Sequence, residues 1–326
     1  MKIAFLTEMG FEGKIPSNHS NMRTEFAWMF NLNADHHNIH NFREVKGYDH
    51  IFVIFPKGRV YLDACGSQIA QDNNPVSELL SFEPIERLKL SNSKVHFIQE
   101  GPHWLWNDYS LPDQIRFFNM LTSCDIIFAH NEHDVKYYKG LIPNVPVHAI
   151  PTLMINSIVE NIQPLREDKV IIGGNFARWY GGMESFMVAQ RFEVPIWGQT
   201  SHAMREGEDQ LIQHLPRVMW TDWMNQLSSF KYAVHLMPTV AAGTFSLNCA
   251  YFGIPCIGNE KVDTQRLCHP DLAVDVEDVE KAAMLAERLK NDPEFYTQCS
   301  IVAKNNYTTY YNEELFKQKI NNILSI

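Results

Sequence analysis

A glycine-rich segment directly after an apolar run is the first place where this sequence could bind a charged ligand. Residues 168–182, DKVIIGGNFARWYGG, place a short strand-like run before two pairs of glycines and one arginine. A strand that ends in glycines and leads into a helix offers backbone N–H groups and the positive helix end to an anion. A guanidinium adds a fork of donors. We predict a diphosphate-binding loop here, and a tight turn without a ligand is the alternative. The residues expected to bind are Gly173, Gly174, Asn175 and Arg178.

A second segment repeats this design. Residues 237–260, MPTVAAGTFSLNCAYFGIPCIGNE, predict a strand end, a loop of small residues, a helix that ends at Phe252 and a further strand. The backbone N–H groups at this helix start would again face an anion, and an asparagine one turn into the helix would reach a ribose hydroxyl. Ordinary crossover packing is the alternative. The donor-binding residues predicted here are Gly243, Thr244, Phe245 and Asn248.

Two such loops after strands of one parallel sheet indicate a single crevice at the carboxyl ends of those strands. This arrangement predicts a nucleotide-type ligand. Its base would lie near Trp197, in one predicted strand, and near Trp223, which follows another. Packing in the core or at its rim is the alternative for both indoles.

The elements that must position these loops alternate between short apolar runs and helical segments, which is typical of parallel sheets with helical crossovers. The runs are rich in Val, Ile and Phe, as expected of strands covered on both faces. Residues 276–307 and 314–324 are predicted to be helical, with a break at Asn291-Asp292-Pro293. The predicted strands are residues 2–7, 50–55, 94–99, 125–130 and 147–150, then 169–174, 193–198, 217–220, 232–237 and 254–259.

The two strand series are separated by residues 151–168, which contain two prolines and end in charged residues. A chain of 326 residues is long for one core and suits two domains. We therefore predict two α/β domains, residues 1–155 and residues 156–326.

Composition limits the class of protein. A hydrophobic content of 45% with 20% charged residues is typical of a globular chain. No apolar run is long enough to span a bilayer, so no membrane partner is expected. The formal net charge of −10 opposes a broad surface for nucleic acid but leaves room for a local basic groove. Six scattered cysteines without a CxxC pair fit a reducing, cytoplasmic location.

The segment GTFSLNCAYFGIPCIGN resembles the donor domain of GT-B glycosyltransferases, and KNDPEF lies where those enzymes carry an Asn-Asp-Pro-Glu helix break. A closer similarity is to the DNA β-glucosyltransferases of T-even bacteriophages. It rests on MKIAF at residue 1, GGNF at residue 173 and the pair Glu184-Ser185. The glycine loop is longer here, a second loop arginine is replaced near Met183, and the ribose carboxylate of that family falls at Asn248.

This resemblance implies two Rossmann-like domains that face a cleft, with the C-terminal helix crossing back to the first domain. It implies an acceptor-binding N-terminal domain, a C-terminal domain that binds a nucleotide-sugar such as a UDP-sugar, and double-stranded DNA with hydroxymethylated pyrimidines as acceptor. Many retaining members carry Glu-x7-Glu where this chain has Val240 and Asn248. The absence of both carboxylates favours an inverting mechanism.

An inverting transfer needs one base that deprotonates the acceptor hydroxyl. Glu100 is the first candidate because it directly follows a predicted strand, and the resemblance puts the family's aspartate at a comparable strand end. Glu8, at the end of the first strand, and His19 are the alternatives; a solvated loop glutamate is the other interpretation of Glu100.

The acceptor is expected to contact loops at residues 8–22, 56–66 and 100–112. If it is DNA, cations would hold its backbone, and Phe11, Tyr61 or Trp104 would hold the flipped base or fill its gap. The predicted acceptor-binding residues are Lys14, His19, Lys57, Arg59, His103 and Trp104.

We expect no tightly bound cofactor and no metal site, because neither histidine cluster, at residues 36–40 and 130–134, has zinc spacing with Cys partners. A divalent ion carried by the donor diphosphate is compatible with this. Three hypotheses remain: a phage-type DNA glycosyltransferase, a cytoplasmic glycosyltransferase acting on a glycan or small molecule, and a non-catalytic nucleotide-sugar-binding protein.

Overall fold

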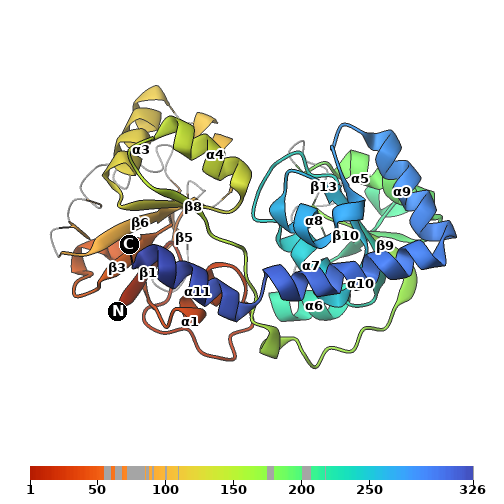
Figure 1. Ribbon diagram of the computed structural model, residues 1–326, viewed down its shortest axis with the longest axis horizontal. Coiled ribbons are helices and arrows are strands. Elements are labelled where there is room, and N and C mark those ends of the chain that lie inside the picture. Colours follow the sequence, from red (N-terminus) through yellow and green to blue (C-terminus); the bar gives the residue numbers. More distant parts are fainter. Residues whose placement is uncertain are drawn as a thin grey trace. The chain divides into compact units, whose positions relative to one another are not determined.

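The computed structural model describes residues 1–54, 60–62, 68–71, 85, 88–89, 92–99, 101–108, 110–174, 180–199, 207–216 and 218–325. The chain divides into two compact units (Figure 1). Unit 1 comprises Met1–His19 and Glu25–Pro151, and unit 2 comprises Ser20–Thr24 and Thr152–Ile326. The short segment 20–24 joins unit 2 because its backbone pairs with the extended segment that follows Pro151: Thr24 N–H donates to Leu153 O and Ile155 N–H to Met22 O.

Unit 1 is built on a six-stranded parallel sheet of order β2-β1-β3-β6-β7-β8. Alternate residues of each strand face opposite sides, so that Leu6 and Phe97 pack against helices α3 and α4 while Phe5 stacks on Phe52 across the other face. The strands are β1 Ile3–Thr7, β2 Asp35–Asn38, β3 His50–Val53, β6 Lys94–Ile98, β7 Ile126–Ala129 and β8 Val147–Ala149. The helices are α1 Glu25–Asn31, α3 Leu111–Ser123 and α4 Glu132–Leu141, with 3-10 turns η1 Ile39–Glu44 and η2 His103–Asp108 and a separate antiparallel pair β4 Val60–Leu62 and β5 Gln68–Gln71.

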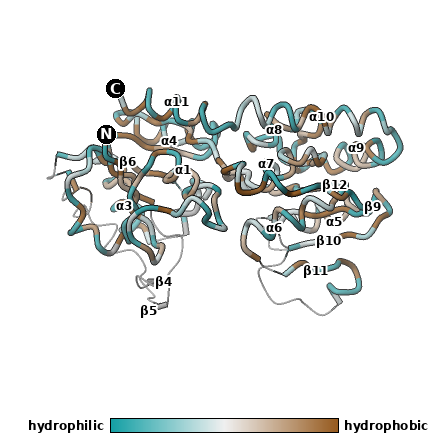
Figure 2. The backbone as a smooth tube through the Cα atoms, turned by 90° about the horizontal axis from the view of Figure 1, so that it is seen from below, coloured by the Kyte–Doolittle hydropathy of each residue, from teal (hydrophilic) through white to brown (hydrophobic). Residues whose placement is uncertain are grey.

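Unit 2 repeats the plan with a parallel sheet of order β11-β10-β9-β12-β13-β14. The strands are β9 Glu167–Ile172, β10 Ile196–Gln199, β11 Gln213–Leu215, β12 Phe230–His235, β13 Cys256–Asn259 and β14 Ala273–Val274. The helices are α5 Gly182–Ala189, α6 Trp220–Leu227, α7 Thr244–Phe252, α8 Asp263–Cys268, α9 Val279–Asn291, α10 Pro293–Tyr310 and α11 Glu313–Leu324. In Figure 2, α9, α10 and α11 alternate between hydrophilic and hydrophobic residues along their length, as helices with one buried side do. Among the described residues, no helix has both the length and the hydropathy that a membrane span requires.

The expected alternation of strands and helices is confirmed, and the predicted helix break is at Pro293, where Asp292 caps α10 by accepting from Phe295 N–H. The strand predicted at residues 217–220 is wrong. Trp220 begins α6, and Trp220, Trp223, Met224 and Leu227 form the buried side of that helix. This spacing is helical, but a four-residue window is too short to show it. The strand itself is β11, a few residues earlier.

A half-buried arginine fastens the start of β9 to two helix ends in unit 2. Arg166 donates from Nη1 to Ser228 O at 2.7 Å and to Phe230 O at 2.9 Å, and from Nη2 to Phe252 O. These carbonyls follow α6, begin β12 and end α7, so one guanidinium joins these elements at the amino-terminal edge of the sheet, opposite the candidate loops.

Replacing Arg166 with Ala should lower the free energy of unfolding of unit 2 by about 3 kcal/mol or more, because three carbonyl groups lose a charged donor. Hydrogen exchange in β9 and β12 under increasing urea measures this unit separately. The matched control is Arg191→Ala, which breaks an exposed ion pair with Glu287 at 3.5 Å and should cost less than about 1 kcal/mol. Equal losses in the two variants would contradict the role of Arg166.

Candidate functional site

All strands of the unit 2 sheet are parallel, but the order in which the chain adds them changes direction between β9 and β12. From β9 the chain passes through α5 to β10 on one side, and from β12 it passes through α7 to β13 on the other. Right-handed crossovers therefore put α5 and α7 on opposite faces of the sheet. A crevice forms at the carboxyl ends of the strands where such a reversal occurs, and this is where ligands bind in open α/β sheets.

Helix α5 begins close to the end of β12 because its first residues have almost no side chain. Gly181 precedes the helix with φ of 61°, in the left-handed region, and a Cβ there would lie 1.8 Å from Leu236 O. Ser185 Oγ, in the first turn, accepts from Leu236 N–H at 2.9 Å. Gly173, at the end of β9, lies so close to the His235 ring that a Cβ would be 2.6 Å from its Cγ. Gly173 and Gly174 are thus placed at this junction as predicted.

Helix α7 begins in the same way. Gly243 has φ of 70°, and a Cβ there would lie 1.9 Å from Thr264 Oγ1. The hydroxyl of Thr264 donates to Gly243 O at 2.8 Å and lies 2.6 Å from Ser246 Oγ. The hydroxyl of Ser246 is therefore engaged within the protein, and the backbone N–H groups of Thr244 and Phe245 face outward as possible donors at this helix start.

Capping separates these helices from most others in the described part of the chain. Side-chain oxygens of Ser110, Asn131, Asp278, Asp292 and Asn312 accept from the first turns of α3, α4, α9, α10 and α11. In the described part of the chain, the residues that precede α5, α7, α6 and α8 make no side-chain cap hydrogen bond. Since the first N–H groups of a helix need an acceptor, α5 and α7 offer theirs to an anionic ligand or to water.

Two polar side chains near this junction have buried atoms without a partner among the described residues. Asn248 is 2% exposed, and its Oδ1 accepts no hydrogen bond. His235, at the end of β12, has an unpartnered Nε2, and burial lowers its pKa to about 4. Its ring packs edge-on against Phe245 at 4.9 Å. An unsatisfied buried acceptor is costly, so Asn248 suits a ligand hydroxyl and His235 stays neutral beside the glycines.

The two predicted base-flanking tryptophans differ in position. Trp223 lies in α6, buried, with its ring 6.3 Å from that of Phe245, and so belongs to the surroundings of α7. Trp197 faces Phe230, the first residue of β12, and Lys169 lies over its ring at 5.4 Å. The described contacts of Trp197 therefore lie toward the amino-terminal half of the sheet, and none of them is with a described residue of the two loops.

Several predicted site residues lie outside the described part of the chain. They are Glu100 as base, Asn175 and Arg178 in the glycine loop, and Lys57 and Arg59 in the acceptor loops.

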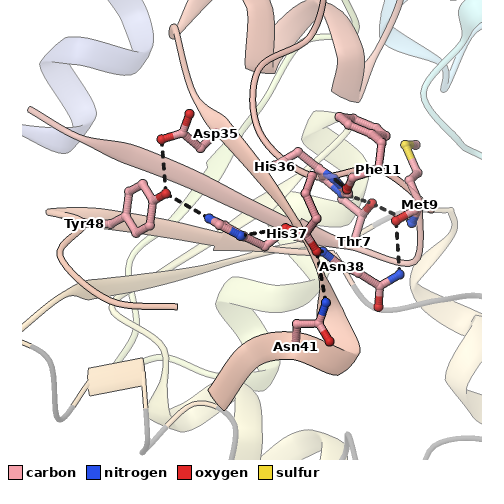
Figure 3. A network of polar contacts seen from close by, with 10 residues as sticks. Thr7, Met9, Phe11, Asp35, His36, His37, Asn38, Asn41 and Tyr48 are labelled. Atoms are coloured by element: carbon pink, nitrogen blue, oxygen red, sulfur yellow. Dashed lines mark hydrogen bonds and ion pairs between the residues drawn. The ribbon is translucent and has the colours of Figure 1, made fainter. Parts of the chain in front are cut away.

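In unit 1, the beginning of the first loop predicted to contact the acceptor, residues 8–22, is fastened to β2 by a polar network (Figure 3). His36, buried in β2, donates from Nδ1 to Phe11 O at 2.6 Å and accepts from Thr7 Oγ1 at Nε2 at 2.8 Å. Burial lowers the pKa of His36 to about 4. Glu12 accepts from Asn38 N–H, from Asn41 Nδ2 and from His37 Nδ1. These hydrogen bonds hold Phe11 and Glu12, at the beginning of the loop, in fixed positions against β2.

Other predicted site residues lie in the same loop: Lys14 and His19 for acceptor binding, and Glu8 and His19 as alternative bases. Lys14 pairs with Asp35 at 3.0 Å, and Glu8 directly follows β1. His19 stacks on Phe26 at 4.7 Å, Phe26 lies 6.0 Å from Phe11, and burial lowers the pKa of His19. The structure joins His19 and Phe11 through one aromatic stack.

His103 lies after β6 and contacts a residue that sequence reasoning missed. Its Nδ1 lies 2.6 Å from Oδ1 of Asp134, whose side chain is fully buried in the first turn of α4. Its ring stacks on Tyr137 at 4.1 Å, and half-buried Trp104 is the next residue in η2. The contact between His103 and Asp134 could have been predicted only from the strand order, because β6 and β7 are neighbours and their carboxyl ends lie together.

His103, His133 and Asp134 form the cluster of described residues whose ligand atoms lie close enough to consider a metal ion. The 2.6 Å between Nδ1 and Oδ1 is a hydrogen-bond length. Two ligand atoms on one tetrahedral zinc are about 3.3 Å apart, given bonds of about 2.0–2.1 Å. His103 and Asp134 are therefore a hydrogen-bonded pair of histidine and carboxylate.

The attachment of the first loop should weaken in acid. Partial burial raises the pKa of Glu12, but the hydrogen bonds from Asn38, Asn41 and His37 outweigh it and leave that pKa below the usual 4.5. A carboxyl group whose pKa is lower in the folded than in the unfolded protein stabilises the folded state fully above pH 4.5. This contribution is lost as the pH falls through the lower pKa of the folded protein. The Asn38 amide, measured by hydrogen exchange, should lose protection in that range. Glu12→Gln should have lower protection at pH 7 and no such step; an identical profile would contradict the role of Glu12.

No protein-family model and no curated protein sequence matches this chain. Solved structures do. An alpha-glucosyltransferase in complex with UDP and a 13-mer DNA containing an HMU base is 9% identical, with a TM-score of 0.62 over 100% of both chains. A sucrose-phosphate synthase from Thermosynechococcus elongatus is 11% identical, with a TM-score of 0.58 over 99% of this chain and 98% of that one.

A UDP-forming trehalose-phosphate synthase from Burkholderia xenovorans is 10% identical, with a TM-score of 0.60 over 86% of this chain and 75% of that one. At such low identity these similarities establish the fold alone. The expected fold class is confirmed: the chain has the GT-B fold, with two Rossmann-like α/β domains of the kind found in nucleotide-sugar-dependent glycosyltransferases.

Proposed function

We propose that this protein is a glycosyltransferase that binds a nucleotide-sugar, with UDP as the carrier, at the carboxyl edge of the unit 2 sheet. The observation that carries the proposal is the pair of uncapped helix starts at the reversal between β9 and β12. Two sets of backbone donors and two positive helix ends at one edge suit a diphosphate. The GT-B fold and the UDP named for a similar structure support the choice of ligand.

The donor would be held by groups of different kinds. The backbone around Gly173, Gly174, Gly243 and Thr244 would contact the diphosphate, and Arg178 and Asn175 would complete the loop. Asn248 would donate to or accept from a ribose hydroxyl, which its unpartnered Oδ1 supports. Phe245 and Trp223 would lie near the base, since their rings are neighbours beside α7.

For the acceptor, we propose a hydroxymethylated pyrimidine in double-stranded DNA. The support is the DNA with an HMU base bound to a similar structure. The acidic balance of the chain, with a formal net charge of −10, favours a second candidate, a glycan or small-molecule alcohol in the cytoplasm, because duplex DNA repels an acidic surface. We propose inversion at the anomeric carbon, supported by Val240 and Asn248 in place of an acidic pair.

The diphosphate assignment predicts that UDP binds much more tightly than uridine in isothermal titration calorimetry. Arg178→Ala should weaken UDP about tenfold or more and leave uridine unchanged, because a charge-assisted contact to phosphate is worth about 1.5–3 kcal/mol. Arg191→Ala, which removes an exposed arginine from the 3-10 turn η4 Gln190–Phe192, serves as the control and should bind UDP normally. Equal affinity for UDP and uridine would contradict a diphosphate site.

The transfer itself is tested by mass spectrometry on one mixture of the protein, UDP- and GDP-sugars, and duplexes that contain hydroxymethylcytosine or hydroxymethyluracil. A mass gain on DNA supports the favoured acceptor. Release of free sugar with unchanged DNA supports an enzyme with another acceptor. Donor binding without turnover would favour a non-catalytic binding protein.

A further inference from the structure

We infer that His103, held by Asp134, accepts the proton of the acceptor hydroxyl, and that the body of the acceptor lies in the groove between α3 and α4. This inference rests on the proposed function and deepens it, since it names the base and the chemical class of the acceptor.

The carboxylate of Asp134 is fixed from both sides. Its Oδ1 lies 2.6 Å from His103 Nδ1, and its Oδ2 accepts from Asn131 Nδ2 at 3.1 Å. Its own backbone N–H donates to Asn131 Oδ1 at 2.8 Å, in the cap of α4. The side chain has no exposed surface. A buried carboxylate with this many partners has one orientation.

That orientation determines what His103 can do. A carboxylate only accepts, so Nδ1 of His103 carries the hydrogen, and in the neutral ring Nε2 then carries the lone pair. The stack on Tyr137 at 4.1 Å holds the plane of the ring. The His103 side chain is 21% exposed, which gives a substrate access to it. A histidine held by a buried carboxylate is well suited to general-base catalysis on a hydroxyl.

The groove beside His103 indicates what the hydroxyl is attached to. It has a volume of about 250 Å³ and lies between η2, α3 and α4. Its described lining is mainly apolar and aromatic, with two amides and no Lys, Arg, Asp or Glu. The two amides are Asn107 and Gln114, and the apolar and aromatic lining includes Ile115, Phe118 and Tyr137. Tyr137 and Phe118 keep more than a third of their surface exposed.

Sites for drug-sized ligands have volumes of about 300–1,000 Å³, so this groove suits one ring rather than an oligosaccharide. Exposed aromatic side chains favour stacking on a planar ring, and the amides would pair with its polar edge. The acceptor class is therefore a primary alcohol on a single uncharged aromatic ring. A hydroxymethylated pyrimidine in DNA and a free aromatic alcohol share this chemistry.

The step is a direct displacement. The acceptor O–H bond breaks and its proton moves to Nε2 of His103, while the acceptor oxygen forms a bond to the anomeric carbon. The bond from that carbon to the donor diphosphate breaks, and the nucleoside diphosphate leaves with the electron pair. One displacement inverts the configuration of the anomeric carbon.

The first test compares His103→Gln with His133→Gln, a matched change one residue from Asp134 at a ring 5.5 Å from that of His103. Acceptors are hydroxymethyluracil duplex DNA, benzyl alcohol and glucose. His103→Gln should lower kcat about 10²–10⁴-fold with unchanged UDP affinity, while His133→Gln keeps the wild-type rate. Free imidazole should partly restore transfer by His103→Ala. Reaction with DNA or with benzyl alcohol identifies the source of the ring, and transfer to glucose alone would overturn the acceptor class.

Asp134 acts through His103, so its test needs a readout beyond activity. Asp134→Asn should lower kcat with little change in the donor KM, and ¹⁵N NMR of the His103 ring should show loss of the Nδ1–H tautomer. A variant with wild-type tautomer and reduced kcat would overturn the positioning role.

Other outcomes would overturn the base assignment alone. These are wild-type transfer by His103→Gln, loss of transfer in Glu100→Gln with His103→Gln still active, or a product with retained configuration. Wild-type protein that neither binds UDP nor turns over a donor would overturn the proposed function together with this inference.

Discussion

The structure of unit 2 depends on how closely backbone approaches backbone where β9 and β12 end. The space that a Cβ of Gly181 would occupy is taken by Leu236 O, and that of Gly243 by Thr264 Oγ1. Both glycines also have left-handed backbone conformations, which other L-residues adopt only at a cost. Because of these two contacts, α5 and α7 begin directly at the edge of the sheet. Any larger residue would move a helix start away from the place where a ligand would meet it.

The two units provide different chemistry at the same edge of the same kind of sheet. In unit 2, the helices around this edge begin without side-chain caps and leave backbone N–H groups for an anion. In unit 1, α3 and α4 are capped by Ser110 and Asn131, so one N–H group at each helix start is already bonded to a side chain. What unit 1 offers instead are side chains that can exchange protons, held by buried partners. This division fits a donor with a diphosphate in one unit and an acceptor hydroxyl in the other.

Sequence patterns predicted most of the strands and the glycines that precede α5 and α7, because apolar runs and glycines before helices report local constraints. They failed where the determinant was not local. The edge strand β2, with the sequence DHHN, has no apolar run and is defined by pairing with β1. Trp220 was assigned to a strand because the buried side of α6 is visible only over eight residues. The contact between His103 and Asp134 spans 31 positions of sequence and depends on the order of β6 and β7 in the sheet.

Hydrogen exchange with and without UDP tests the central claim most directly. Helix-start amides that no side chain caps exchange readily when they face water, and a bound diphosphate would protect them. A donor site at this edge predicts new protection at residues 182–184 and 244–246, with little change at the capped starts of α9 and α10. Protection confined to unit 1 or to α9, with no change at residues 182–184 and 244–246, would contradict a donor site at the reversal between β9 and β12.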